Sequence, residues 1–221
     1  MEPFDSEKII RRIREIKLNG VIEENELRAR FLHKVKEDSR VLDCGQSLRE
    51  FWPEAKNRAF KAVTLDINQF ADYPDILADI CDYDFLRKYE NSFDLISCFS
   101  LIEHTYNPFW ACGNLFSMCR PGGMIFGSAP FLFPRHSPED LSYQDYFRFT
   151  RDSYALLFPN ARSIELFPLR GRLATSLNVL TLKYRFILEK SSPKLSQLIN
   201  RMLAKGNHAL NSSGYGFIVT K

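Results

Sequence analysis

The sequence predicts an α/β fold in which a mostly parallel sheet carries helices on both faces. Short apolar runs alternate with helical segments along residues 41–129, and several of these runs end in an acidic residue or a glycine turn. With 221 residues, of which 45% are hydrophobic and 26% charged, the chain can bury one sizeable core. We therefore expect a single domain over residues 1–221, with a helical extension (1–37), a central core (38–169), a basic helical insertion (170–213) and a closing strand (214–221).

Two amphipathic helices are expected ahead of the sheet. The first covers residues 5–18, with Ser6 as its N-cap and Gly20 as its stop. The second begins near Glu24 and continues with an apolar side chain at each turn. Their apolar faces comprise Ile9, Ile13 and Ile16 in the first helix and Leu27, Phe31 and Val35 in the second. These faces predict that both helices cover an edge of the sheet or the cleft of the core.

Seven apolar runs predict the strands of the sheet. They lie at 41–43, 62–66, 76–80, 93–99, 124–129, 163–167 and 215–220. Short helices are expected at 48–55 and 150–158. Between the fourth and fifth strands, a longer helix has Asn107 as its N-cap and Pro108 in its first turn, and it ends at the turn 120–123.

The net charge of +3 is distributed unevenly along the chain. Residues 170–221 contain nine Lys or Arg and one acid, whereas residues 37–169 contain twelve basic and nineteen acidic residues. Within the basic segment, residues 194–205 predict an amphipathic helix with Lys194, Arg201 and Lys205 on its surface. This helix is a candidate for peripheral contact with an anionic membrane that holds lipid-linked substrates, or else it is an ordinary solvated face.

The sequence favours a reduced, cytoplasmic protein. The first residues show no basic region followed by an apolar run, so no secretory signal is predicted, and no apolar stretch reaches the length of a bilayer span. The five cysteines are odd in number and include no CxxC pair, which argues against disulfides and against a structural zinc site. No metal ligand is predicted.

Three sequence patterns together point to a known family. Residues 41–45 (Val-Leu-Asp-Cys-Gly) join a strand to a glycine turn, residues 130–136 read Pro-Phe-Leu-Phe-Pro-Arg-His, and residues 145–150 read Asp-Tyr-Phe-Arg-Phe-Thr. On these residues the chain resembles class I S-adenosylmethionine (SAM)-dependent methyltransferases, over residues 38–160 and the last strand. More narrowly, it is similar to small, methyltransferase type 11-like enzymes of glycan and lipopolysaccharide biosynthesis, which carry Pro-Phe-x-x-Pro-x-His and Asp-Tyr-Trp-Arg-Phe-Thr after the fifth strand. The resemblance implies a Rossmann-like sheet of seven strands with an antiparallel last strand.

The same resemblance implies that the first strand and its turn approach the methionine portion of SAM. Asp43 and Gly45 match the family motif, but Ser47 and Arg49 stand where the family has two further glycines. Glycine is preferred at such positions because the backbone passes close to the ligand or takes a positive φ, and serine would do so at a cost of about 1 kcal/mol. Arg49 would either pair with the cofactor carboxylate or occupy the cleft.

Other implied cofactor residues lie at the ends of the following strands. Asp66 would accept hydrogen bonds from both ribose hydroxyls, with Ile67 packing on the adenine, and Asp79 with Ile80 would receive the adenine amino group and ring. The remaining implied cofactor residues follow the fourth strand and are Phe99, Ser100, Leu101 and His104. Each polar side chain also has a purely structural alternative: a turn or cap for Asp66, a solvated acid for Asp79 and a structural hydrogen bond for His104.

The loop 130–149 is the expected acceptor site. Its aromatic residues, which would stack on a sugar or another ring, are Phe131, Phe133, Tyr143, Tyr146, Phe147 and Phe149. His136 or Asp145 is a candidate base for a hydroxyl acceptor, and Arg148 a candidate partner for a phosphate or carboxylate. The alternative is that Asp145, Arg148 and the aromatic residues only lock the loop onto the following helix.

The expected function is SAM-dependent, in-line methyl transfer to a small-molecule, glycan-type or lipid-linked acceptor. The alternative is a catalytically degenerate domain that serves as an interaction or regulatory module; the substituted glycines favour it, whereas the retained acidic residues and aromatic loop favour the enzyme. A dinucleotide-dependent oxidoreductase is disfavoured because residues 45–50 do not match GxGxxG and no tyrosine is followed four residues later by lysine. Nucleic-acid methylation is disfavoured for want of a recognition module.

Overall fold

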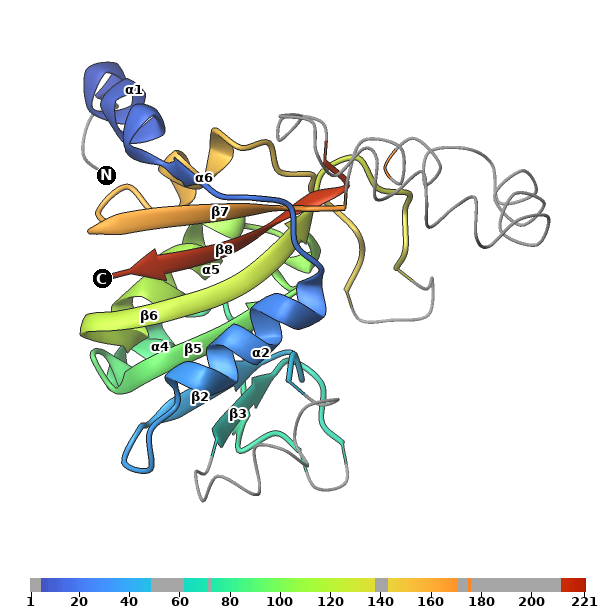
Figure 1. Cartoon of the computed structure of the whole chain (residues 1–221). Helices are drawn as coiled ribbons and strands as arrows, with labels where there is room; N and C mark the ends of the chain where they lie inside the picture. The colour runs from blue at the N-terminus through green and yellow to red at the C-terminus, as the bar shows by residue number, and fades with distance from the viewer. Residues whose placement is uncertain (1–4, 49–61, 71–72, 138–142, 171–174, 176–211) are drawn as a thin grey trace.

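The computed structural model describes residues 5–48, 62–70, 73–137, 143–170, 175 and 212–221 (Figure 1). Several predictions therefore lie outside the described residues. Residues 49–55 of the short helix predicted at 48–55 are among them, and they include Arg49. Nearly all of the basic insertion predicted at 170–213 also lies outside, together with its helix at 194–205. Within the described part of the chain, none of the helices has the length and apolar character needed to cross a bilayer.

The described residues form one mixed sheet with the strand order β1-β7-β8-β6-β5-β2-β3-β4. The strands are β1 (Lys17–Leu18), β2 (Val41–Cys44), β3 (Ala62–Asp66), β4 (Ile76–Leu77), β5 (Phe93–Phe99), β6 (Cys119–Pro130), β7 (Ser163–Leu169) and β8 (Gly214–Thr220). Strand β8 is antiparallel to β6 and β7, and every other neighbouring pair is parallel. The predicted fold class, with its mostly parallel sheet and antiparallel last strand, is confirmed.

The sheet has eight strands rather than the expected seven. The additional strand is β1, which pairs in parallel with β7 in the register Lys17 with Glu165 and Leu18 with Leu166. Lys17 and Leu18 were expected to belong to the first helix, predicted over residues 5–18, but α1 (Ser6–Glu15) ends before them. Pairing with a distant strand, with Lys17 Nζ 2.7 Å from Glu165 Oε2, therefore outweighs the local helical pattern.

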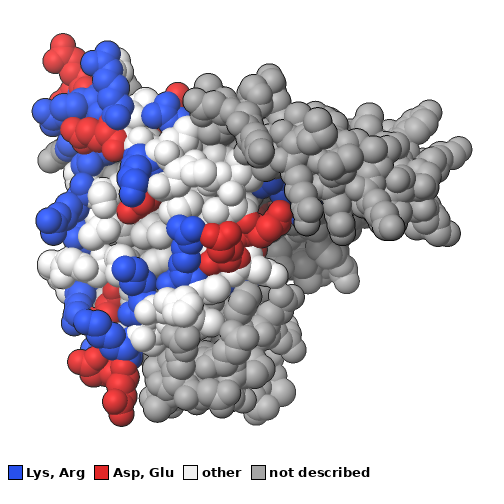
Figure 2. Space-filling model, viewed as in Figure 1, with Lys and Arg blue, Asp and Glu red and all other residues white. Residues whose placement is uncertain are grey.

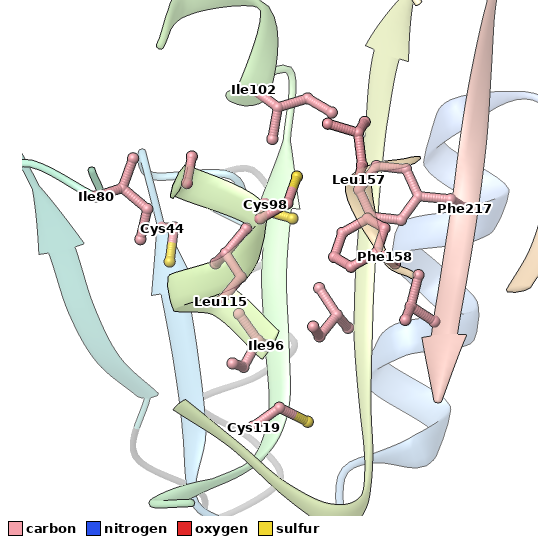
Figure 3. Close-up of a cluster of buried hydrophobic side chains, with 14 of the residues drawn as sticks. Cys44, Ile80, Ile96, Cys98, Ile102, Leu115, Cys119, Leu157, Phe158 and Phe217 are labelled. Carbon is pink, nitrogen blue, oxygen red and sulfur yellow. The ribbon is translucent and has the colours of Figure 1, made fainter. Parts of the chain in front are cut away.

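Helices cover both faces of the sheet (Figure 1). Helix α2 (Glu24–Lys34) buries Leu27, Phe31 and Leu32 against one face, where Leu95 and Phe99 of β5 point. Helices α5 (Pro108–Met118) and α6 (Ser153–Leu157) cover the other face. There they pack against Ile96 and Cys98 of the same strand (Figure 3). The side chains of β5 therefore point alternately into two apolar clusters, as expected for a strand buried on both sides.

The predicted cap residues are confirmed for the start of α5 but not for the start of α1. The α5 prediction is confirmed, because Asn107 Oδ1 accepts hydrogen bonds from the backbone N–H groups of Phe109 and Trp110. The N-cap of α1 is Asp5 and not Ser6, since the Asp5 carboxylate accepts the N–H of Lys8 at 3.0 Å. The turn expected at 120–123 is absorbed into the long strand β6. The remaining helical segments are α4 (Tyr83–Leu86) and the 3-10 turns η2 (Arg87–Tyr89) and η3 (Ile102–His104).

Basic and acidic side chains are interspersed on the face that Figure 2 shows, with blue and red side by side over α1 and α2. On α2 they form ion pairs one turn apart, Glu24 with Arg28 at 2.7 Å and Glu26 with Arg30 at 2.6 Å. Such paired surfaces differ from the uniformly basic stripe that is typical of nucleic-acid binding.

The Gly127→Ala variant is expected to lower the free energy of unfolding by about 1–3 kcal/mol, because β6 and β8 leave no room for a methyl group. A Cβ atom at this position would collide with the Phe217 ring and lie 2.7 Å from the carbonyl oxygen of Cys98. Gly113→Ala on the exposed side of α5 is the matched control, since nothing lies within 4 Å of its Cβ, and it should stabilise by about 1 kcal/mol. Urea unfolding of both variants checks this, and an unchanged Gly127→Ala stability would contradict the packing described.

Candidate cofactor and acceptor site

A cavity of about 180 Å³ opens where the parallel strands end. Because the carboxyl ends of parallel strands meet at one edge of the sheet, the segments after β2, β3, β4 and β5 converge there. Eight of the predicted cofactor residues line this first cavity: Gly45, Asp66, Ile67, Asp79, Ile80, Ser100, Leu101 and His104. The structure thus brings together residues from four separate segments, and their roles toward the cofactor stay predictions.

The turn after β2 takes the left-handed conformation at two successive residues, Gly45 (φ 67°) and Gln46 (φ 55°). The Gly45 N–H donates to the Leu65 carbonyl at 2.9 Å, and the Gln46 N–H donates to the Tyr73 hydroxyl at 2.7 Å. A Cβ at Gly45 would lie 3.0 Å from Leu101 Cδ1. The backbone requirement for glycine therefore falls on Gly45, and Ser47 carries no positive φ.

Three of the predicted cofactor residues lie behind the cavity wall. Asp43 is fully buried, and its carboxylate accepts hydrogen bonds from the Ser47 and Ser97 hydroxyls, each at 2.6 Å. Ser47 thus braces the turn through its side chain. Phe99 packs in the α2 cluster, with the Arg28 guanidinium 4.7 Å from its ring centroid. None of the three lines the first cavity, and their roles toward the cofactor stay predictions.

Two acidic side chains stand at successive strand ends on the cavity wall. Asp66 is 9% exposed, and its Oδ1 accepts the N–H of Asn68 at 2.8 Å. Asp79 Oδ1 accepts the N–H of Cys81 at 2.8 Å. The Asp66 bond matches the turn considered as its structural alternative, whereas Asp79, considered as a solvated acid, is half-buried and holds a local turn. The two bonds also orient the carboxylates of two neighbouring strands toward one cavity, so a single ligand can reach both.

The loop after β6 is held by an ion pair between Asp145 and Arg148. The Arg148 guanidinium contacts both carboxylate oxygens of Asp145, with Nη2–Oδ2 at 2.6 Å. It also donates to the backbone carbonyls of Phe133, Pro134 and Phe147. This set of contacts favours the locking role of Arg148 over the binding of an acceptor phosphate or carboxylate.

Asp145 is the anionic centre of this loop. Burial alone would raise the pKa of its carboxyl, but the hydrogen bonds from the Arg148 guanidinium and the His136 backbone N–H outweigh burial and lower the pKa to about 2. Its Oδ2 also lies 3.2 Å from His136 Nδ1. A carboxylate with so low a pKa is a weak base, and its contacts favour a role for Asp145 in orienting His136, while its role as a base stays a prediction.

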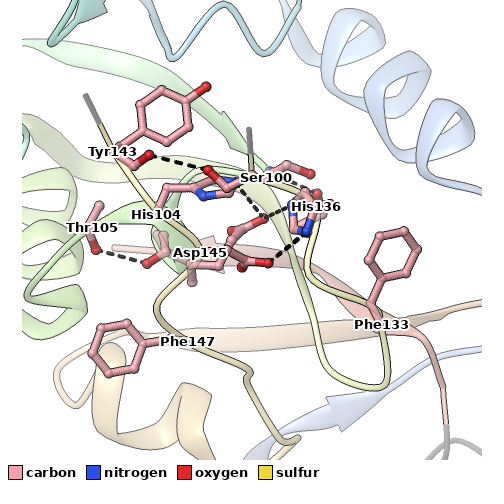
Figure 4. A network of polar contacts seen from close by, with 12 residues as sticks. Ser100, His104, Thr105, Phe133, His136, Tyr143, Asp145 and Phe147 are labelled. Carbon is pink, nitrogen blue, oxygen red and sulfur yellow. Dashed lines mark hydrogen bonds and ion pairs between the residues drawn. The ribbon is translucent and has the colours of Figure 1, made fainter. Parts of the chain in front are cut away.

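His104 and His136 lie close together (Figure 4), and both are near the buried side chain of Glu103. The rings of His104 and His136 lie with centroids 5.0 Å apart, and the Nε2 atom of each is 3.8 Å from Glu103 Oε1. His104 Nδ1 is 3.0 Å from the Gln144 carbonyl oxygen, which is the structural hydrogen bond considered for this residue. Burial lowers the pKa of His104 and raises the pKa of Glu103 to about 8.

A second cavity, of about 700 Å³, adjoins the first. The two share Ser100 and His104 in their walls. The second cavity is lined by Phe133 and His136 of the predicted acceptor loop and by acidic residues of two other segments, Glu24 and Glu103. Tyr143 and Tyr146, which were expected to face the acceptor, instead line the first cavity.

Several site residues were not predicted from the sequence. Thr105 and Tyr106 line the first cavity, and Glu24, from a helix expected only to cover the sheet, lines the second. Glu103 stands directly before the predicted cofactor residue His104, and the sequence patterns assign it no role. The sequence signal that could have identified Glu103 is an acidic residue directly before a histidine, shortly after an apolar strand.

Comparisons with known proteins agree with the fold described above. A family model described as a methyltransferase domain matches residues 11–169. None of the curated proteins searched matches the chain. Among solved structures, the chain is similar to a SAM dependent methyltransferase from Archaeoglobus fulgidus, with a TM-score of 0.54, 15% identity, and 89% of this chain and 94% of that chain covered.

Two further structures share the fold. One is a Haemonchus contortus phosphoethanolamine N-methyltransferase 2 in complex with phosphomonomethylethanolamine and S-adenosylhomocysteine (SAH), with a TM-score of 0.53, 17% identity, and 91% of this chain and 54% of that chain covered. The other is a Burkholderia thailandensis 1,6-didemethyltoxoflavin-N1-methyltransferase with bound 1,6-didemethyltoxoflavin and SAH, with a TM-score of 0.51, 11% identity, and 89% and 76% covered. With the family model spanning most of the sheet, the chain belongs to the methyltransferase domain family and has its Rossmann-like fold.

Proposed function

We propose that this methyltransferase transfers the methyl group of SAM to a small-molecule or glycan-type acceptor. The observation that carries the proposal is the pair of adjoining cavities at the carboxyl ends of the parallel strands, which share Ser100 and His104. The smaller cavity has the two strand-end carboxylates that a ribose and an adenine amino group require. The larger one provides room for an acceptor next to it.

Each cavity has its own part in the reaction. Asp66 would hold the ribose hydroxyls and Asp79 the adenine amino group, while the backbone at Gly45 approaches the methionine portion. A cofactor held in this way would present its methyl group near Ser100 and His104, which line both cavities. Methyl transfer is an in-line displacement, in which the acceptor atom forms a bond to carbon as the carbon–sulfur bond breaks and its electron pair stays on sulfur. Positioning therefore supplies much of the catalysis.

The polar lining of the second cavity favours an acceptor with oxygen or nitrogen groups. Glu24, Glu103 and His136 provide charged or hydrogen-bonding atoms, and Phe133 offers an aromatic face for a sugar or another ring. Two proteins of the same fold, named above, are in complex with small molecules besides SAH. The glycan-type acceptor rests on the motif resemblance of residues 130–136 and 145–150.

The reaction is tested by measuring SAH release from the purified full chain with SAM and a panel of acceptors. The hydroxyl acceptors in the panel are nucleotide sugars, free sugars and catechols. Small amines are tested separately. We expect turnover with at least one hydroxyl compound above the acceptor-free background, and loss of that turnover in an Asp66→Ala variant. SAM binding without turnover on any acceptor would favour the degenerate alternative, in which the domain serves as an interaction module.

We further propose that the protein works in a reducing, cytoplasmic compartment. All five cysteines are free thiols and all are buried in the core, for example Cys44 and Cys98 beside α5 (Figure 3). Buried thiols of this kind need no oxidising environment for folding. Peripheral membrane contact through residues 194–205 remains a proposal that rests on the sequence alone.

A further inference from the structure

Glu103 is a buried carboxyl group with no hydrogen-bond partner among the other described residues. Its side chain is 0% exposed, and neither carboxylate oxygen accepts a hydrogen bond from any residue that the structure describes. The groups beside it are the Nε2 atoms of His104 and His136, both 3.8 Å from Oε1 and therefore beyond hydrogen-bond length. Buried polar groups are nearly always satisfied in native proteins, so this carboxylate calls for a further partner.

Both histidines are oriented with their Nε2 lone pairs toward this carboxylate. His104 Nδ1 lies 3.0 Å from the Gln144 carbonyl, which can only accept, so Nδ1 carries the proton and Nε2 of the neutral ring does not. His136 Nδ1 lies 3.2 Å from Oδ2 of the ionised Asp145 carboxylate, a contact that favours a proton on the same ring nitrogen. A backbone carbonyl or a carboxylate on the outer ring nitrogen is the usual support of a metal-binding histidine.

We propose that Glu103, His104 and His136 bind one divalent first-row metal ion, of the Zn²⁺ or Mn²⁺ type. One donor atom from each of the three residues lies within 4.8 Å of the others. Bonds of about 2.1 Å to the metal bring tetrahedral donors to roughly 3.4 Å from one another, so modest side-chain rotation completes the site. Two imidazoles and one carboxylate form the ligand set of many catalytic metal sites, which keep further positions open.

The open positions of this ion face the second cavity, because all three ligands line it. The role assigned here rests on the proposed function: the ion would bind a hydroxyl oxygen of the acceptor and lower the pKa of that hydroxyl. The hydroxyl proton passes to solvent, the oxygen forms the new bond to the methyl carbon, and the carbon–sulfur bond breaks with its electrons left on sulfur. The metal favours acceptors with two neighbouring oxygens, such as catechols or sugar diols, over amines.

This inference departs from the expectation that the chain has no metal ligand. Glu103 and His104 are adjacent in the sequence, but His136 follows on a different loop, and no fixed metal-binding spacing joins them. His136 lies beside Glu103 and His104 because the loop after β6 is held by the ion pair of Asp145 with Arg148, and Figure 4 shows His104, His136 and Asp145 together.

The test measures metal binding directly on the full chain, without reference to activity. Protein stripped with a chelator is titrated with Zn²⁺ and with Mn²⁺ by calorimetry, and Co²⁺ is added to record the absorption of a His-ligated site. We expect one equivalent to bind to the wild type and to His33→Ala, a control that removes an exposed histidine of α2. Glu103→Gln and His136→Ala should each weaken binding by about 100-fold or more.

Circular dichroism and thermal unfolding of each variant show whether it is folded. If His136→Ala does not fold, the isosteric Glu103→Gln variant still tests the site. Metal binding that is equal in wild type, Glu103→Gln and His136→Ala, or less than one equivalent in the wild type, would overturn the site. SAM binding is measured on the same samples. Metal binding without SAM binding overturns only the proposed function, and SAM binding without metal binding overturns only this inference.

Discussion

Replacing Asp66 by alanine is expected to weaken SAM binding by about 100-fold or more. The Asp66 carboxylate lies at the end of β3 on the wall of the first cavity, and its backbone position is fixed by pairing with β4. Two ribose hydroxyls would donate charge-assisted hydrogen bonds to it, each contributing about 1.5–3 kcal/mol. Loss of both corresponds to at least two orders of magnitude in the dissociation constant. Calorimetric titration of the variant with SAM and with SAH measures this loss.

The control for this variant is Asp84→Ala, which removes the same charge from an exposed position of α4 outside the cavity lining. It should bind SAM like the wild type, within about 2-fold. If Asp66→Ala and Asp84→Ala bind SAM equally well, the first cavity does not hold the ribose, and the assignment of Asp66 fails.

The second large effect is expected for Asp145→Ala, which should lower the free energy of unfolding by about 2–4 kcal/mol. The Asp145 side chain is 0% exposed and engages Arg148 through both oxygens, so its removal leaves a largely enclosed guanidinium without its counter-charge. It also removes the acceptor of the His136 N–H. Urea unfolding gives the magnitude, and amide hydrogen exchange over residues 130–137 should show faster exchange in the variant.

Asp152→Ala is the matched control, since its contact with Arg151 is 3.7 Å long and the Asp152 side chain is 58% exposed. An exposed pair of this kind contributes at most about 1 kcal/mol. A stability loss in Asp145→Ala no greater than that of Asp152→Ala would show that the loop is held by its aromatic contacts instead of the ion pair.

The fold was predictable where local patterns and packing agree. Asn107 and Pro108 mark the start of α5 because the cap is a contact between residues close in the sequence. Strand β1 was missed because Lys17 and Leu18 gain their partners from β7, about 148 residues further along the chain. Nothing in the helical spacing of the preceding isoleucines reveals that distant pairing.

The candidate site was predictable at the strand ends and less so in the loops. Asp66 and Asp79 are found from their place after apolar runs, because parallel topology brings such ends together. The contact of Ser47 with Asp43, and the meeting of Glu103 with His136, depend on side-chain directions that a linear pattern does not encode. The same holds for Arg148, whose role depends on which carbonyls surround it.

The most direct test of this account is a calorimetric titration of the full chain with SAM and with SAH, supported by thermal unfolding at saturating ligand. We expect one equivalent to bind with a dissociation constant on the order of micromolar, and about 2.7 kcal/mol of added stability at 100 times that concentration. The turn at Gly45 and Gln46, with Ser47 bonded to Asp43, would then be a working cofactor turn despite its missing glycines. A folded sample that shows neither heat nor stabilisation at millimolar SAM would contradict the account.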